Sequence, residues 1–302
     1  MNQPQIAVFA RSAKEDTPPL RAIEGQKSLL GRTMHDIAFD AIHDEIVVTS
    51  PLTQAILTFR GAASGEEPPL RIIQGDKTQI KGVGATGKVA IDAEHGEIYI
   101  ATPDQTILVF NRTDNGNVAP KRVLGGPHTM LSLGKQNTDP NSFSGIGNTY
   151  GGGNPPCLRI DPVHNLLLAP VEGVGAATGA VLVFDRTASG DTPPKAIIKG
   201  PVRMGNQFEI YPPTLQLITH FANNFEIWKI PESGTSTEGP IKIPAPLGRQ
   251  STDIGMVLDP LHKEVIVASA AGNAIETFYV PEEYEAQKFT SGTAAPKAAG
   301  GQ

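Results

Sequence analysis

Short apolar runs follow one another along the whole chain, and Gly, Pro, Asn or Asp residues separate them. One set of such runs occupies residues 88–92, 97–101, 106–110 and 121–124. These runs are rich in β-branched and aromatic side chains, so the pattern predicts strands rather than helices. Four runs in succession predict a four-stranded antiparallel sheet, whose strands are named A to D from the inside outwards.

The third run of each set carries a motif that recurs about every 50 residues, which is the period expected of a propeller or related array. The clearest copies are Ile6-Ala-Val-Phe-Ala-Arg11, Ile56-Leu-Thr-Phe-Arg60, Ile107-Leu-Val-Phe-Asn-Arg112 and Val181-Leu-Val-Phe-Asp-Arg186, with weaker copies at Ile227-Trp228 and Ile275-Glu-Thr-Phe278. Small sheets repeated radially leave only short, protected edges. The sequence therefore predicts an all-β fold consisting of a single β-propeller, with the motif aromatic residues between blades.

The number of blades follows from counting strands. Five A–B pairs begin near Asp36, Lys88, Leu158, Phe208 and Ile254. Six C-like strands are present, because the chain both starts and ends on one. We expect the N-terminal strand, Ile6–Arg11, to close the ring as the outer strand of the sheet formed by residues 254–280. This gives five blades, with six as the alternative. The propeller then spans residues 1–281, and the polar residues 282–302 form a flexible tail.

The turn between strands A and B has the same pattern in four sets. It begins with Asp and has His three residues later, at Asp40/His43, Asp92/His95, Asp161/His164 and Asp259/His262. Asp accepts hydrogen bonds from nearby backbone amides in turns, so we interpret these pairs as structural. With the surrounding strands, the repeat resembles NHL-type six-bladed propeller repeats over roughly residues 5–280. That resemblance implies a fold and no particular activity.

Composition and charge narrow the classes of function. The 302 residues include 25 Lys and Arg against 31 Asp and Glu, and no basic run stands out, which argues against nucleic-acid binding. No apolar stretch reaches the roughly 18 residues needed for a membrane span. The N-terminus lacks a signal-peptide core, so we expect a cytoplasmic protein or one numbered after export. The single cysteine, Cys157, excludes an internal disulfide and is expected to be packed.

One connection is much longer than the others. The motif residues Phe110 and Phe184 are 74 positions apart, and the excess falls in residues 125–156, between strand D of one blade and strand A of the next. Long loops in compact domains are usually functional or disordered. We interpret this loop as a flap over the channel, with Tyr150 as an aromatic anchor and Asn148 and Asn154 as hydrogen-bonding residues. A simple spacer is the alternative.

Three histidines, His35, His128 and His220, lie outside the turn pattern. They fall in D–A or B–C connections, which share one face of a propeller, opposite the A–B turns. Three neutral imidazoles that converge there could hold Zn²⁺ or another divalent ion and activate water or a carbonyl. Some NHL-type propellers are lyases with a metal on the channel axis, so the resemblance is compatible with this site. Ordinary packing roles for the three histidines are the alternative.

These observations leave three hypotheses about function. The first is a non-catalytic binding module that holds a protein or small-molecule ligand on the D–A/B–C face. Its candidate binding residues are His35, His128, Asn148, Tyr150, Asn154, His220 and Asn223. The second is a metal-dependent lyase or hydrolase with the three-histidine site at the channel mouth. The third is a structural subunit of a larger assembly.

Overall fold

The computed structural model describes residues 4–31, 36–81, 89–102, 104–131, 157–172, 178–201, 208–221, 223–236, 238–245, 253–269 and 274–289. Over these ranges the regular elements are 22 strands and six 3₁₀ helices of three or four residues. No helix in the described part is long and apolar enough to cross a membrane.

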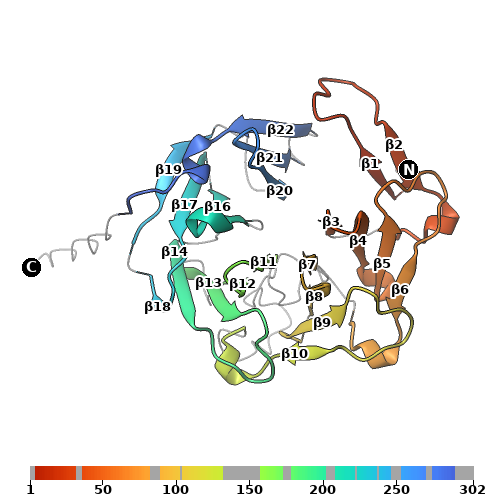
Figure 1. The fold of residues 1–302 in the computed structure, drawn as a ribbon, viewed down its shortest axis with the longest axis horizontal. Helices are drawn as coiled ribbons and strands as arrows, with labels where there is room; N and C mark the ends of the chain where they lie inside the picture. Colours follow the sequence, from red (N-terminus) through yellow and green to blue (C-terminus); the bar gives the residue numbers. More distant parts are fainter. Residues whose placement is uncertain are drawn as a thin grey trace, which may run out of the picture.

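Small antiparallel sheets stand side by side around a ring, which confirms the predicted five-bladed propeller (Figure 1). Blade 1 consists of β3 (Ile37–Asp40), β4 (Glu45–Ser50), β5 (Ala55–Arg60) and β6 (Arg71–Gln74). Blade 2 consists of β7 (Val89–Asp92), β8 (Glu97–Ala101), β9 (Ile107–Asn111) and β10 (Arg122–Leu124). Blade 3 consists of β11 (Arg159–Asp161), β12 (Leu166–Glu172), β13 (Thr178–Asp185) and β14 (Ala196–Pro201). Blade 4 consists of β15 (Phe208–Tyr211), β16 (Gln216–Phe221), β17 (Asn224–Lys229) and β19 (Ile241–Pro244), and blade 5 of β20 (Asp253–Asp259), β21 (Glu264–Ser269) and β22 (Ala274–Tyr279).

The N-terminal segment closes the ring differently from the prediction. Strand β1 (Gln5–Val8) pairs with β2 (Arg21–Glu24), the next strand in the sequence, and not with β22. The expected pairing of Ile6–Arg11 with the sheet of residues 254–280 is therefore wrong. The β1–β2 hairpin lies between blades 5 and 1, and the side chain of Arg11 just beyond β1 bonds to blade 5.

The C–D loops fasten one blade to the next through the main chain. A glycine in each loop lies beside the D strand of the preceding unit, in the pairs Ile23/Gly65, Ile73/Gly116, Leu124/Gly190 and Ala196/Gly234. The last of these belongs to β18 (Gly234–Thr235), which runs parallel to β14. All four glycines have φ between 61° and 80°, a left-handed conformation that costs glycine little and other residues more.

Apolar side chains fill the spaces between blades. The motif aromatic residues Phe59, Phe110, Phe184 and Trp228 are at most 3% exposed, which confirms their predicted position between blades. Phe278 is partly buried against the core shared by blades 4 and 5. Phe9 is 39% exposed, so the prediction is wrong for this residue, which follows β1 next to the point of ring closure.

The ordered part of the chain continues beyond blade 5. Residues Pro281–Tyr284 form the 3₁₀ helix η6, and Glu283 and Tyr284 are buried. Tyr284 donates a hydrogen bond to the carbonyl of Glu264, and the amide of Gln287 donates one to Gln216. Of the expected tail 282–302, the first eight residues thus pack on blades 4 and 5, and residues 290–302 lie outside the described residues.

We expect the change Phe110→Ala to lower the free energy of unfolding by about 3–5 kcal/mol, because it leaves a cavity between blades 1 and 2. Phe39→Ala is the matched control, since Phe39 is 57% exposed. Urea unfolding followed by fluorescence measures both variants. Equal losses would contradict the assignment of Phe110 to the inter-blade core.

Candidate functional site

Each Asp–His turn is a closed structural unit. The Nδ1 atoms of His43, His164 and His262 lie 2.8 Å from the paired carboxylate oxygens of Asp40, Asp161 and Asp259, and His95 lies 2.9 Å from Asp92. The same carboxylates accept the backbone amides of the histidines. The predicted structural role of these four pairs is confirmed.

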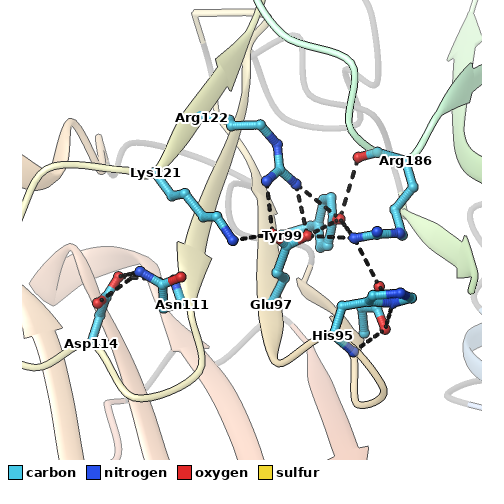
Figure 2. A network of polar contacts seen from close by, with 9 residues as sticks. His95, Glu97, Tyr99, Asn111, Asp114, Lys121, Arg122 and Arg186 are labelled. Carbon is cyan, nitrogen blue, oxygen red and sulfur yellow. Dashed lines mark hydrogen bonds and ion pairs between the residues drawn. The ribbon is translucent and has the colours of Figure 1, made fainter.

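A buried carboxylate ties blade 2 to blade 3 (Figure 2). Glu97, the first residue of β8, is 2% exposed. It accepts two hydrogen bonds of 2.7 Å from Arg122 and one each from Lys121 (2.6 Å), Tyr99 (2.7 Å) and Arg186 (2.7 Å). Burial by itself raises the pKa of Glu97, but the bonds from Arg122, Lys121 and Tyr99 outweigh it and hold the pKa well below its usual range.

The same clamp recurs at two other junctions. In blade 1, Glu45 accepts hydrogen bonds from Arg71 of the same blade (2.6 Å) and from Arg112 of blade 2 (2.9 Å). In blade 5, Glu264 accepts one from Arg11, beyond β1 (2.6 Å). In each case the glutamate is the first residue of strand B. The arginine that binds it belongs to the next unit and lies two residues after the motif aromatic residue of that unit. These clamps hold neighbouring blades together.

Among the described residues, Asp259, His262 and Glu264 are the one group of three potential metal ligands. The guanidinium of Arg11 already lies against two of them, 3.1 Å from Asp259 and 2.6 Å from Glu264. A cation at this position would have to displace Arg11. The arrangement matches the clamps of blades 1 and 2, so we assign it a structural role.

A second charged group lies on the innermost strands. Arg159 of β11 and Glu209 of β15 form an ion pair of 2.6 Å, and each side chain is 16% exposed. The Arg159 guanidinium also lies 5.9 Å from the ring centre of Phe208. Asp36, directly before β3, acts electrostatically on both members of the pair. Blades 1, 3 and 4 therefore contribute charges to one region, at the D–A ends of their A strands.

Burial and pairing act in opposite directions on this ion pair. Burial by itself lowers the pKa of Arg159, but Glu209, together with other nearby acidic groups, more than restores it, so the pKa of Arg159 is raised. Burial raises the pKa of Glu209, and the attraction of Arg159 only partly opposes this. The carboxylate of Glu209 thus depends on Arg159 for its charge.

The histidines and Asn223 proposed from the sequence lie in three settings. His128, in η4 (Pro127–Thr129), is exposed and its Nδ1 lies 2.6 Å from Asp191 in the C–D loop of blade 3. His220, near the end of β16, packs edge-to-face on Phe225 with ring centres 5.6 Å apart. Asn223 is exposed in the turn between β16 and β17.

The remaining proposed residues, His35, Asn148, Tyr150 and Asn154, lie outside the described residues, as does most of the 125–156 loop. The three-histidine metal site therefore stays a prediction. The sequence analysis missed Arg159 and Glu209. The signal available was their shared repeat position, two residues before the A–B turn, where two successive blades carry opposite charges within apolar strands.

Comparisons with known proteins support the architecture alone. No protein-family model and no curated protein matches the chain. Among solved structures, a chain in a crystal structure of the mitotic checkpoint complex is similar, with a TM-score of 0.51 and 12% identity. The match covers 87% of this chain and 65% of that one, so this chain spans less than two thirds of its length. At this identity the likeness shows the fold, and membership of the NHL family is not shown.

We expect Glu97→Gln to lower stability at pH 7 by about 3 kcal/mol, because it leaves the guanidinium groups of Arg122 and Arg186 without their carboxylate. The pKa of Glu97 is lowered in the folded state, so its contribution is complete above the ordinary value of 4.5 and is lost as the pH falls further. The gap between wild type and variant should therefore narrow below pH 4.5 in urea titrations. Glu67→Gln, at an exposed pair with Arg60, is the control and should change little.

We expect Arg159→Leu and Glu209→Leu each to cost about 3–5 kcal/mol, since each leaves a mostly buried charge without its partner. The double variant should cost clearly less than the sum of the two. A double-mutant cycle from chemical unfolding measures this coupling. Additive losses would show that the two side chains do not depend on each other.

Proposed function

We propose that this propeller is a non-catalytic binding module whose protein partner engages the D–A/B–C face. The observation that carries this proposal is the convergence of Asp36, Arg159 and Glu209, from three different blades, at the D–A ends of the inner strands. A partner on this face reaches several blades at once, and charged groups at its centre provide orientation and specificity. The 125–156 loop is the proposed recognition element.

The opposite face offers less for recognition. Its Asp–His turns are closed by hydrogen bonds within each turn, and the carboxylates of Asp40, Asp92 and Asp161 are at most 1% exposed. The clamps around Glu45 and Glu97 are also mostly buried. Carboxylates that are paired and fully enclosed gain little from a partner, whereas Arg159 and Glu209, although paired, each remain 16% exposed. The polar chemistry of that face therefore supports the fold.

The proposal is tested by changing one face at a time. One variant replaces residues 132–156 with a Gly/Ser linker, and the matched control carries His43→Ala and His262→Ala on the opposite face. We expect a partner identified by cross-linking to the wild type to bind the control normally. Its affinity for the loop variant should fall at least about tenfold, the size expected when a central contact is removed. Loss of binding in the control alone would assign the partner to the other face.

Metal analysis separates this proposal from a metal-dependent lyase or hydrolase. The second function requires His35, His128 and His220 to share an ion, although Asp191 already holds His128. Protein purified without chelator or nickel should contain only substoichiometric metal. A full equivalent of Zn²⁺ or another divalent ion, lost in a His35→Ala/His220→Ala variant, would replace the binding module with the enzyme.

A further inference from the structure

The junction between blade 5 and blade 1 differs from all the others. Ile37 of β3 is 51% exposed. The residues at the same repeat position, which pack against the preceding blade, are at most 6% exposed: Val89, Leu158, Phe208 and Met256. Phe39, also on β3, is 57% exposed. The inner part of blade 1 thus presents uncovered apolar side chains where other blades have a neighbour.

The facing wall, on blade 5, is uncovered in the same way. Ile275 of β22 is 61% exposed. Its equivalents, which pack against the following blade, are at most 1% exposed: Ile56, Ile107, Val181 and Phe225. Val257 of β20 and Tyr279 of β22 are 52% and 70% exposed. Ile37 and Ile275, on the two walls of a single junction, are therefore exposed at positions that are core elsewhere in the ring.

The β1–β2 hairpin fills only the outer part of this junction. Its register, with Ile6 opposite Ile23 and Val8 opposite Arg21, matches strands C and D of blades 1 and 2. Beside β1, on the edge away from β2, the described residues place no strand. The hairpin therefore corresponds to the outer half of a further blade, without its A and B strands (Figure 1).

Arg21 shows which side chain the missing strands would carry. Its equivalents Arg71 and Arg122 bind the carboxylates of Glu45 and Glu97, the first residues of the B strands in their own blades. Arg21 donates to the carbonyl of Gly61, but its Nη1 atom is buried and has no hydrogen-bond partner in the described structure. A buried guanidinium nitrogen without an acceptor is costly. The position calls for a carboxylate.

Blade 3 supports the interpretation that Arg21 lacks a carboxylate partner. Its B strand begins with Leu166 in place of Glu, and the residue of β14 equivalent to Arg21 is Ala196. Both residues belong to one apolar cluster. In this fold the D-strand arginine accompanies a B-strand glutamate, and the hairpin has the arginine without the glutamate.

We infer that the junction is a docking site for a β-hairpin of the chain's own A–B type, supplied by another polypeptide segment. Its second strand would pair with the free edge of β1, and its apolar residues would cover Ile37, Phe39 and Ile275. A glutamate at the start of that strand would bind Arg21. Addition of strands to an exposed sheet edge is an established mode of peptide recognition. This surface is distinct from the face assigned under the proposed function.

The first test uses a synthetic peptide with the sequence of residues 89–102, which form the β7–β8 hairpin of blade 2. We expect this peptide to bind the full chain in calorimetry, and the same peptide with the change Glu97→Gln to bind about tenfold more weakly. Against the Arg21→Met protein the two peptides should bind equally, because the guanidinium that distinguishes them is gone. Arg60→Met, which removes an exposed arginine paired with Glu67 inside blade 1, is the control protein and should keep the tenfold difference.

Isolated two-stranded hairpins are marginal in water, so a tethered form makes the test decisive. The sequence of residues 87–106, placed directly before Gln5, raises the effective concentration of the hairpin at the junction. We expect the midpoint of thermal unfolding to rise by roughly 5 °C, and by less when the added copy of Glu97 is replaced by Gln. No rise together with no peptide binding would overturn the inference. The inference would also be overturned if sedimentation analysis showed that the wild type is a dimer and cross-linking placed Ile275 in the dimer interface. The junction would then bind a second copy of this chain.

Discussion

Each blade of this propeller needs a neighbour on both of its faces. A sheet of three or four short strands with apolar residues on both sides leaves those residues in water, and in this fold a sheet against each face buries them. Separate apolar clusters accordingly occupy the junctions between blades 1 and 2, 2 and 3, 3 and 4, and 4 and 5. A fifth cluster joins the N-terminal hairpin to blade 1. The ring is the arrangement that satisfies this requirement for consecutive blades.

The polar clamps also need residues from a neighbouring blade, because each buried glutamate is neutralised partly by an arginine of the next unit. In blade 2, Glu97 is neutralised by Arg122 of its own D strand and Arg186 of the next blade. At the corresponding positions, blade 3 and its neighbour carry Leu166, Ala196 and Ile230, which pack together in one apolar cluster. A single charge left at any of these buried positions would lack its partner, and in blades 1 to 3 the three positions are accordingly either all charged or all apolar. The clamp fixes the alignment of two blades more than it adds stability.

Local patterns predicted the parts of the fold that depend on neighbours in the sequence. The strands of residues 88–124 and the Asp–His turns were found correctly, because side-chain alternation and turn residues act over a few positions. The partner of the N-terminal strand was not, since the repeat identifies it as a C strand but does not say which edge it joins. The useful signal was Arg11, two residues after Phe9, because Arg112 and Arg186 at that position bind the preceding blade. The pair Arg159–Glu209 joins residues 50 positions apart and appears only once the register of two blades is known.

The incomplete junction is connected to the charged group formed by Asp36, Arg159 and Glu209. Asp36 directly precedes β3, the strand whose apolar face is uncovered, and its carboxylate accepts a hydrogen bond from the amide of Val89 in blade 2. The N-terminal hairpin joins blade 1 through an apolar cluster and backbone contacts. It reaches blade 5 through Arg11, whose side chain is half exposed, so water weakens its ion pairs. Junctions with little buried apolar surface open more readily than the rest of a fold. A hairpin bound in the junction would immobilise β3. It would thereby fix the position of Asp36 relative to Arg159 and Glu209. Binding at the junction would therefore change the arrangement of charges on the face proposed to hold the partner.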